Sequence, residues 1–171
     1  MSHTDLFRTN TFTAVLHHYA NKDWTLLNLG CGIGWHMQDI PAKNQLHVDV
    51  WKPYLEQIKH KLSVIQLNIK DLSMFPDKSW DLVMCIDVIE HLEKPDAEKA
   101  ILEMERIARK RVVLYTPAGM HIQEDGHGWG SGNPEFQKHR CGFEQAEMIA
   151  KGYSSHMSRE SPPGQLCVKD L

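Results

Sequence analysis

The sequence lacks long apolar runs, closely spaced cysteines and an excess of charge of either sign. No apolar run approaches the roughly 18 residues that a transmembrane helix needs, so no membrane partner is expected. The cysteines form no Cys-x-x-Cys pair, and no secretory signal pattern stands at the start, which predicts a reduced, cytoplasmic protein without a disulfide framework. The formal net charge of -3 gives no general attraction to nucleic acid, so no nucleic-acid partner is expected.

What is present is the composition of an ordinary globular domain. Hydrophobic residues make up 42% of the 171 residues and charged residues 24%, close to the averages for globular proteins. A chain of this length fits one domain and is long enough to bury a substantial core. We therefore expect a single domain over residues 1–171.

Short apolar segments typical of strands alternate with amphipathic helical patterns through most of the chain. Strands are predicted over residues 24–29, 45–49, 62–68, 80–86, 111–117, 153–159 and 165–171. Helices are predicted over residues 7–20, between Gly34 and Pro41, and over residues 53–61, 95–110 and 143–152. The alternation predicts an α/β fold with a Rossmann-like, doubly wound, seven-stranded and mostly parallel sheet. The last two strands are expected to add an antiparallel edge at the C-terminus.

Glycines follow the first predicted strand at two-residue spacing, at Gly30, Gly32 and Gly34. Glycine allows a sharp turn and lets a ligand approach the backbone closely. A dinucleotide site of the Gly-x-Gly-x-x-Gly type would need its third glycine where Trp35 stands. Asp49 closes the second strand and is suited to accept hydrogen bonds from both hydroxyls of a ribose. This pattern favours an adenosine-containing ligand without a pyrophosphate.

Other polar residues also fall where predicted strands end. Asn68 closes the third strand, and Asp87, Glu90 and His91 follow the fourth. Ligands of doubly wound sheets bind in the crevice beyond the carboxyl ends of the strands. The sequence therefore predicts one site at this edge of the sheet.

Successive segments resemble, in order, the motifs of class I S-adenosylmethionine-dependent methyltransferases: LLNLGCGIG, HVDVW, LNIKDLSMFPDKSWDLVMCIDVIEHL and ILEMERIARKRVVLYTPAG. The resemblance runs from about residue 26 to 119 and is greatest to the small-molecule branch with an Asp-x-x-Glu-His-Leu segment after the fourth strand. It implies S-adenosyl-L-methionine as cofactor, S-adenosyl-L-homocysteine as product and a small organic molecule as methyl acceptor.

The resemblance also implies a set of cofactor-binding residues: Asn28, Gly30, Cys31, Gly32, Gly34, Asp49, Val50, Trp51, Asn68, Ile69, Ile86 and Asp87. The glycine loop would wrap the amino acid and ribose parts of the cofactor, and Asp49 would hold the ribose hydroxyls. Val50 or Trp51 would lie against the adenine. Asn28 stands where the family usually has an acidic residue that orients the methionine amino group, so cofactor affinity is expected to be lower.

Asp87 and His91 are the candidate catalytic residues, because a hydroxyl acceptor must lose its proton and an imidazole titrates near neutral pH. The position of His91, four residues after Asp87, favours a purely structural role in which it fixes the start of the following segment. Trp35 has two open roles as well: covering the cofactor or acceptor, or simple packing.

The long polar segment after Pro117 contains four potential metal ligands: His121, His127, His139 and Cys141. Their spacing matches no ordinary zinc pattern, so no metal site is predicted. We interpret the segment over residues 120–141 as a lid that faces the substrate. Within it, Trp129, Phe136 and His139 are candidates for acceptor contacts, although Phe136 could equally anchor the loop.

Three functions from different classes are compatible with the sequence. The first is a methyltransferase. The second is a catalytically weak partner subunit or scaffold that binds S-adenosylmethionine, which only Asn28 supports. The third is an NAD-dependent oxidoreductase, which Trp35 disfavours. Because no cap domain is inserted, the acceptor site could be open to solvent or completed by a partner subunit, and the chain could form a homo-oligomer.

Overall fold

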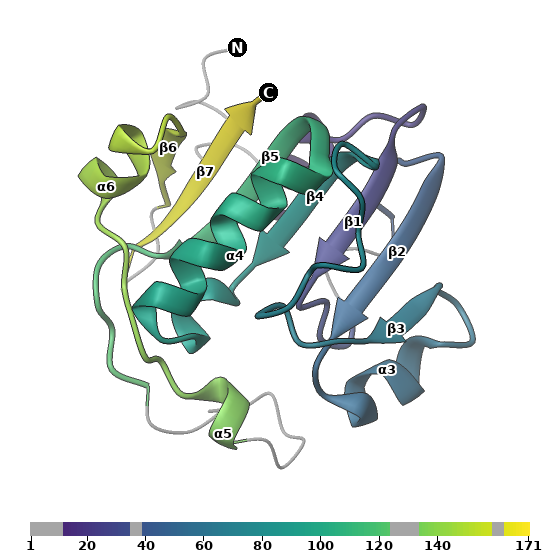
Figure 1. Ribbon diagram of the computed structural model, residues 1–171, viewed down its shortest axis with the longest axis horizontal. Coiled ribbons are helices and arrows are strands. Elements are labelled where there is room, and N and C mark those ends of the chain that lie inside the picture. The colour runs from purple at the N-terminus through teal and green to yellow at the C-terminus, as the bar shows by residue number, and fades with distance from the viewer. Residues whose placement is uncertain (1–11, 35–38, 124–133, 159–162) are drawn as a thin grey trace.

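The computed structural model describes residues 12–34, 39–123, 134–158 and 163–171 (Figure 1). Its seven strands form one sheet in the order β3-β2-β1-β4-β5-β7-β6. The strands are β1 (Thr25–Leu29), β2 (Asn44–Asp49), β3 (Val64–Gln66), β4 (Trp80–Ile86), β5 (Ala108–Pro117), β6 (Ser154–Met157) and β7 (Gly164–Asp170). Strands β1 to β5 are parallel to one another, and β7 is antiparallel to both β5 and β6. The predicted α/β, mostly parallel sheet with antiparallel C-terminal strands is confirmed.

The helices of the described residues are α2 (Phe12–Tyr19), α3 (Lys52–Ile58), the short 3-10 helix η1 (Ile89–His91), α4 (Lys94–Ile107), α5 (Pro134–Gln137) and α6 (Gln145–Ala150). None of these helices is long and apolar enough to cross a bilayer. The helix predicted between Gly34 and Pro41 falls largely on residues 35–38, outside the described residues, as does Trp35.

Successive side chains of a strand point to opposite faces of the sheet. Apolar residues stand at both sets of positions, so the sheet buries both of its faces. On β4, Val83 and Cys85 pack on the face that α4 covers, whereas Leu82 and Met84 pack on the opposite face with α2. Helix α4 lies across β4 and β5 in Figure 1. The two-sided burial explains why the parallel strands read as continuous apolar runs.

The end of α4 differs from the prediction. The pattern indicated a helix to residue 110, but the helix ends at Ile107 and β5 begins at Ala108. The side chains of Arg109 and Lys110 reach Asp81 at 2.8 and 3.1 Å, so this basic stretch lies beside β4 in the sheet. Ion pairs with Asp81 therefore hold Arg109 and Lys110 in the strand.

The C-terminal strand β7 lies inside the sheet, and β6 forms its edge. The burial patterns match these positions, because β7 is buried over its first five residues whereas β6 has exposed ends. Near the middle of the sheet, the chain order reverses between the neighbouring strands β1 and β4. A reversal of this kind opens a crevice at the carboxyl ends of the strands, which is where the candidate site lies.

Candidate active site

A cavity of about 800 Å³ opens at the carboxyl ends of β1 to β4. This volume is within the range of small-molecule sites. Most of the predicted site residues line it: Asn28, Gly30, Cys31, Gly32, Asp49, Val50, Asn68, Ile69, Ile86, Asp87 and His91. Gly34 and Trp51 were predicted to contact the cofactor, but they are not part of the cavity wall. The structure thus brings together residues from four strand ends.

The glycine loop turns sharply because Gly30 and Gly32 have φ angles of 71° and 53°. The backbone N–H groups of Gly30 and Cys31 both donate to the Val48 carbonyl, at 2.7 and 2.9 Å, which ties the loop to β2. A Cβ atom at Gly30 would lie 2.2 Å from Cγ2 of Val88, whereas one at Gly32 would meet nothing within 4 Å. Packing therefore excludes a side chain at Gly30, and at Gly32 the backbone borders open space.

Gly34 serves the turn itself. Its N–H donates to the Cys31 carbonyl at 2.9 Å, and its φ angle is 74°. A Cβ atom here would lie 3.3 Å from Cδ1 of Leu62, so the residue faces packed side chains of the fold. Because Gly34 faces these side chains, it is not part of the cavity wall. The two-residue spacing of the glycines does not indicate which of them face the cavity.

Asp49 joins the glycine loop to the loop after β2. Its Oδ2 accepts from the N–H of Gly32 and its Oδ1 from the N–H of Trp51, both at 2.8 Å. The residue is only 7% exposed. Burial raises the pKa of Asp49, and the N–H groups of Trp51 and Gly32 oppose this effect. The carboxylate therefore orders both loops at the cavity wall.

Asn28 pairs with a buried histidine. The Asn28 side chain is 1% exposed, and its Nδ2 lies 3.3 Å from Nδ1 of His47. Burial lowers the pKa of His47 to about 4, so the imidazole is neutral and its Nδ1 can accept a hydrogen bond from Asn28. This pairing leaves the carbonyl oxygen of Asn28 available to a ligand in the cavity.

The turn after β4 carries the predicted catalytic residues. Asp87 adopts a φ angle of 52°, unusual for a residue with a side chain, and its N–H donates to the Tyr115 carbonyl at 2.8 Å. Asp87 is exposed at the cavity, whereas Glu90 is 2% exposed and accepts a hydrogen bond from Oγ1 of Thr116 at 3.0 Å. Burial, and then the neighbouring Asp87 carboxylate, raise the pKa of Glu90.

The described parts of the predicted lid frame the same cavity. Its lining residues from this segment are His121, Ile122, Gln123, Glu135, Phe136, Gln137, His139 and Arg140. The N–H groups of Arg140 and Cys141 donate to the Glu90 carbonyl at 2.8 and 3.1 Å, which joins the segment to η1. The Phe136 ring lies 6.0 Å from that of Trp51, centroid to centroid, so Trp51 supports a wall residue. His127 and Trp129 lie outside the described residues.

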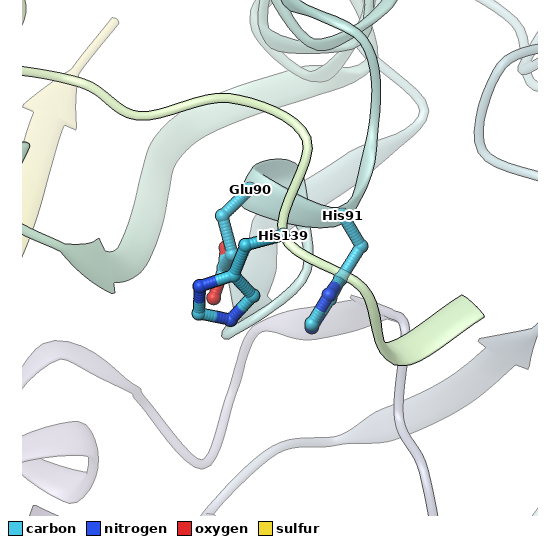
Figure 2. A group of neighbouring side chains, drawn as sticks. All are labelled: Glu90, His91 and His139. Atoms are coloured by element: carbon cyan, nitrogen blue, oxygen red, sulfur yellow. The ribbon is translucent and has the colours of Figure 1, made fainter. Parts of the chain in front are cut away.

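One cluster was not predicted from the sequence. Glu90 and His91 from η1 meet His139 from the lid segment, with one ligand atom of each residue within 4.8 Å of the others (Figure 2). These residue types and their convergence fit a metal ion. Of the four potential ligands named from the sequence, His139 belongs to this cluster, whereas Cys141 donates its thiol to the Ile89 carbonyl at 3.4 Å. The adjacent pair Glu90-His91 was the available signal, but its third member comes from a distant segment.

His91 is neutral near physiological pH. Burial, followed by the proximity of His139, lowers the pKa of His91 to about 4. The His91 Nδ1 lies 3.3 Å from the Lys138 carbonyl oxygen. A neutral imidazole can donate one hydrogen bond there and still present a lone pair on its other nitrogen.

Residues 27–116 match the family model described as "Methyltransferase domain". The chain belongs to this methyltransferase family. Its fold is that of class I S-adenosylmethionine-dependent methyltransferases, as the sequence resemblance implied. The matched region begins within β1, contains β2 to β4 and nearly all of β5, and therefore includes the glycine loop, Asp49 and the turn at Asp87.

Two curated proteins are similar in sequence to this chain. An uncharacterized protein of Methanocaldococcus jannaschii is 31% identical over 129 residues, which are 73% of this chain and 56% of that protein. Ajmaline N-methyltransferase of Rauvolfia serpentina is 31% identical over 111 residues, which are 58% of this chain and 38% of that protein. The chain thus spans about half the length of the first relative and less of the second.

Among solved structures, magnesium protoporphyrin IX methyltransferase of Synechocystis, with bound S-adenosylhomocysteine, has the same fold. It aligns with a TM-score of 0.64 at 15% sequence identity, over 92% of this chain and 79% of that chain. At 15% identity, this similarity shows that the two proteins share a fold and carries no further conclusion.

Proposed function

We propose that this methyltransferase transfers the methyl group of S-adenosyl-L-methionine to a small organic acceptor. The observation that carries the proposal is the open space at Gly32, beside the buried Asp49 carboxylate, in a cavity of about 800 Å³. The methyltransferase family of the chain and the S-adenosylhomocysteine bound by the Synechocystis protein of the same fold support it.

The cavity wall offers the polar groups that the cofactor needs. A carboxylate has about four lone-pair sites. Asp49 uses two of them for Gly32 and Trp51, so both of its oxygens can still accept from ribose hydroxyls. The backbone from Gly30 to Gly32 would wrap the amino acid part, and the free carbonyl oxygen of Asn28 would accept from its amino group. Asn28 supplies no charge, which lowers affinity relative to an acid.

The adenine would lie between the loops after β2 and β3. Val50, Asn68 and Ile69 line this part of the cavity. The Asn68 Oδ1 accepts from the Lys70 N–H at 3.0 Å, which holds the amide in place to meet the adenine edge. Ile86 and Asp87 would then face the methionine part. Gly34 and Trp51 support these loops from outside the wall.

The chemistry requires mainly positioning. When bound, S-adenosylmethionine supplies a methyl group already activated on a positively charged sulfur. Orientation of an acceptor in line with that group can provide roughly 7 to 11 kcal/mol of barrier reduction. Asp87, exposed at the cavity, is placed to take a proton from a hydroxyl acceptor. His91 is a weaker proton acceptor than the sequence suggested, because its pKa is about 4.

Calorimetric titration with S-adenosylhomocysteine and, separately, with NAD tests the cofactor assignment. We expect binding of S-adenosylhomocysteine at one site and no heat from NAD. Binding of NAD alone would refute the proposal and favour an oxidoreductase. Transfer of a labelled methyl group from S-adenosylmethionine into a fraction of small metabolites then separates an enzyme from a scaffold. Cofactor binding without transfer into any fraction supports the scaffold.

A further inference from the structure

Two imidazoles and one carboxylate converge beside the proposed acceptor position. Figure 2 shows Glu90 and His91 projecting from η1 toward His139, which comes from the lid segment. The two ring centroids are 5.0 Å apart. All three residues line the cavity, on the side formed by the turn after β4. They therefore face the space that holds the acceptor if the cofactor occupies the glycine-loop side.

Both imidazoles are oriented in the same way. The Nδ1 of His139 lies 2.8 Å from the His121 carbonyl oxygen, and that of His91 lies 3.3 Å from the Lys138 carbonyl oxygen. A carbonyl oxygen can only accept, so the tautomer that satisfies each of these two contacts carries its proton on Nδ1 and keeps a lone pair on Nε2. Metal-binding histidines are commonly held by a hydrogen bond of this type from the ring nitrogen that does not bind the metal.

Glu90 supplies a buried acid without a paired cation. Thr116 donates to Oε2 at 3.0 Å, and within the described ranges no lysine or arginine forms an ion pair with this carboxyl group. A buried carboxylate is costly unless it is paired or binds a metal. The Glu90 backbone carbonyl also accepts from Arg140 and Cys141, so the acid and His139 are held on adjoining segments.

We propose that Glu90, His91 and His139 bind a divalent first-row transition-metal ion that positions a hydroxyl group of the acceptor. Metal–nitrogen bonds near 2.1 Å would draw each ligand inward by roughly an ångström from its present position. Two imidazoles and a carboxylate on one side of an ion leave coordination positions open. Mg²⁺ prefers oxygen ligands, so this set favours Mn²⁺ or Co²⁺ over Mg²⁺.

The site deepens the proposed function, on which its catalytic role rests, by assigning an alcohol or phenol as acceptor. An ion that coordinates a hydroxyl lowers its pKa and aligns its oxygen. The acceptor O–H bond breaks and the proton passes to the Asp87 carboxylate. An oxygen lone pair then forms the bond to the methyl carbon, while the carbon–sulfur bond of S-adenosylmethionine breaks and its electron pair stays on sulfur. The products are a methyl ether and S-adenosylhomocysteine.

Metal binding is tested directly on chelator-treated protein. Titration with Mn²⁺, followed by the loss of the free-ion magnetic resonance signal, should show one bound ion, and Mg²⁺ should compete poorly. Glu90→Gln keeps a side-chain oxygen that can accept from Thr116, and His139→Gln keeps a polar side chain of similar size. Each substitution should weaken Mn²⁺ binding by at least tenfold, about 1.4 kcal/mol. His60→Gln, at an exposed position outside the cavity wall, is the matched control and should bind as the wild type does.

Two further readouts test the role of the ion. Azide should change the visible absorption of the Co²⁺-loaded protein, because it occupies open positions on the metal. The label-transfer product should carry its methyl group on oxygen. Wild-type protein that binds no Mn²⁺, or variants that bind it as tightly as the wild type, would overturn the metal site. A spectrum unchanged by azide, or a methyl group found on nitrogen, would overturn its role toward the acceptor.

The metal proposal and the cofactor proposal can fail separately. S-adenosylhomocysteine binding is measured on the same chelator-treated protein, without any ion. Cofactor binding with no Mn²⁺ binding overturns the metal site and leaves the methyltransferase proposal standing. Mn²⁺ binding with no S-adenosylhomocysteine binding overturns the methyltransferase proposal and leaves the metal site standing.

Discussion

Replacing Gly32 by asparagine separates ligand binding from folding. Gly32 has a φ angle of 53°, and a Cβ atom there would meet nothing within 4 Å. Asparagine is one of the residues that best tolerate this left-handed backbone conformation. The strain of a side chain at positive φ costs about 1 kcal/mol. For a chain of this size, that corresponds to a decrease of roughly 2 to 4 °C in the melting temperature.

The effect on the cofactor is expected to be much larger. The new side chain would enter the cavity beside Asp49, where the ribose and amino acid parts of the cofactor are proposed to lie. Forcing extra atoms into an occupied site costs about 1 to 3 kcal/mol, and displaced hydrogen bonds at Asp49 add to this. We expect the affinity for S-adenosylhomocysteine to fall by roughly a hundredfold, about 2.7 kcal/mol, in calorimetric titration.

Gly152→Asn is the matched control. Gly152 also has a positive φ angle, 87°, but it ends the turn after α6 and is not part of the cavity wall. A Cβ atom there would lie 3.4 Å from Cε of Lys169. This variant should lose similar stability and bind S-adenosylhomocysteine normally. If Gly32→Asn binds within threefold of the wild type, the cofactor does not approach the backbone at this loop, and the site assignment is wrong.

Other predictions concern acidic residues. Asp49→Ala should weaken S-adenosylhomocysteine binding more than tenfold, because it removes charge-assisted contacts, whereas Asp23→Ala on the surface should not; equal calorimetric affinities would contradict the ribose role. Asp87→Asn should lower kcat at least tenfold in the label-transfer assay at saturating S-adenosylmethionine; an unchanged kcat would remove Asp87 as the proton acceptor. Burial alone would raise the pKa of Asp81, but the Thr25 N–H and the adjacent cationic side chains lower it to about 2. Since this lies below the unfolded value of about 3.9, the stabilisation is present above pH 4 and is lost as the pH falls toward 2, by about 2 kcal/mol in urea unfolding. Asp81→Asn should abolish most of that pH dependence, and a variant with the wild-type profile would show that other carboxyl groups cause it.

Most of the fold could be predicted from the sequence because burial of a parallel sheet is a local signal. The apolar run Trp80–Ile86 was predicted as a strand and is β4. The alternation of strands and helices then constrains the topology, since parallel connections are right-handed and short. The end of α4 could not be predicted, because Arg109 and Lys110 suit a helix terminus as well as they suit the strand that Asp81 holds.

The sequence by itself determined that polar residues would meet beyond the strand ends. Gly32, Asp49 and Asp87 follow buried strands, and strands that run parallel must place their carboxyl ends at one edge. Only the tertiary structure decided which groups face the cavity. Gly34 turns toward Leu62, and His139 joins Glu90 because the Glu90 carbonyl accepts the N–H groups of the segment that follows His139. Contacts of this kind depend on the path of a long connection through space, and no local pattern of residues encodes that path.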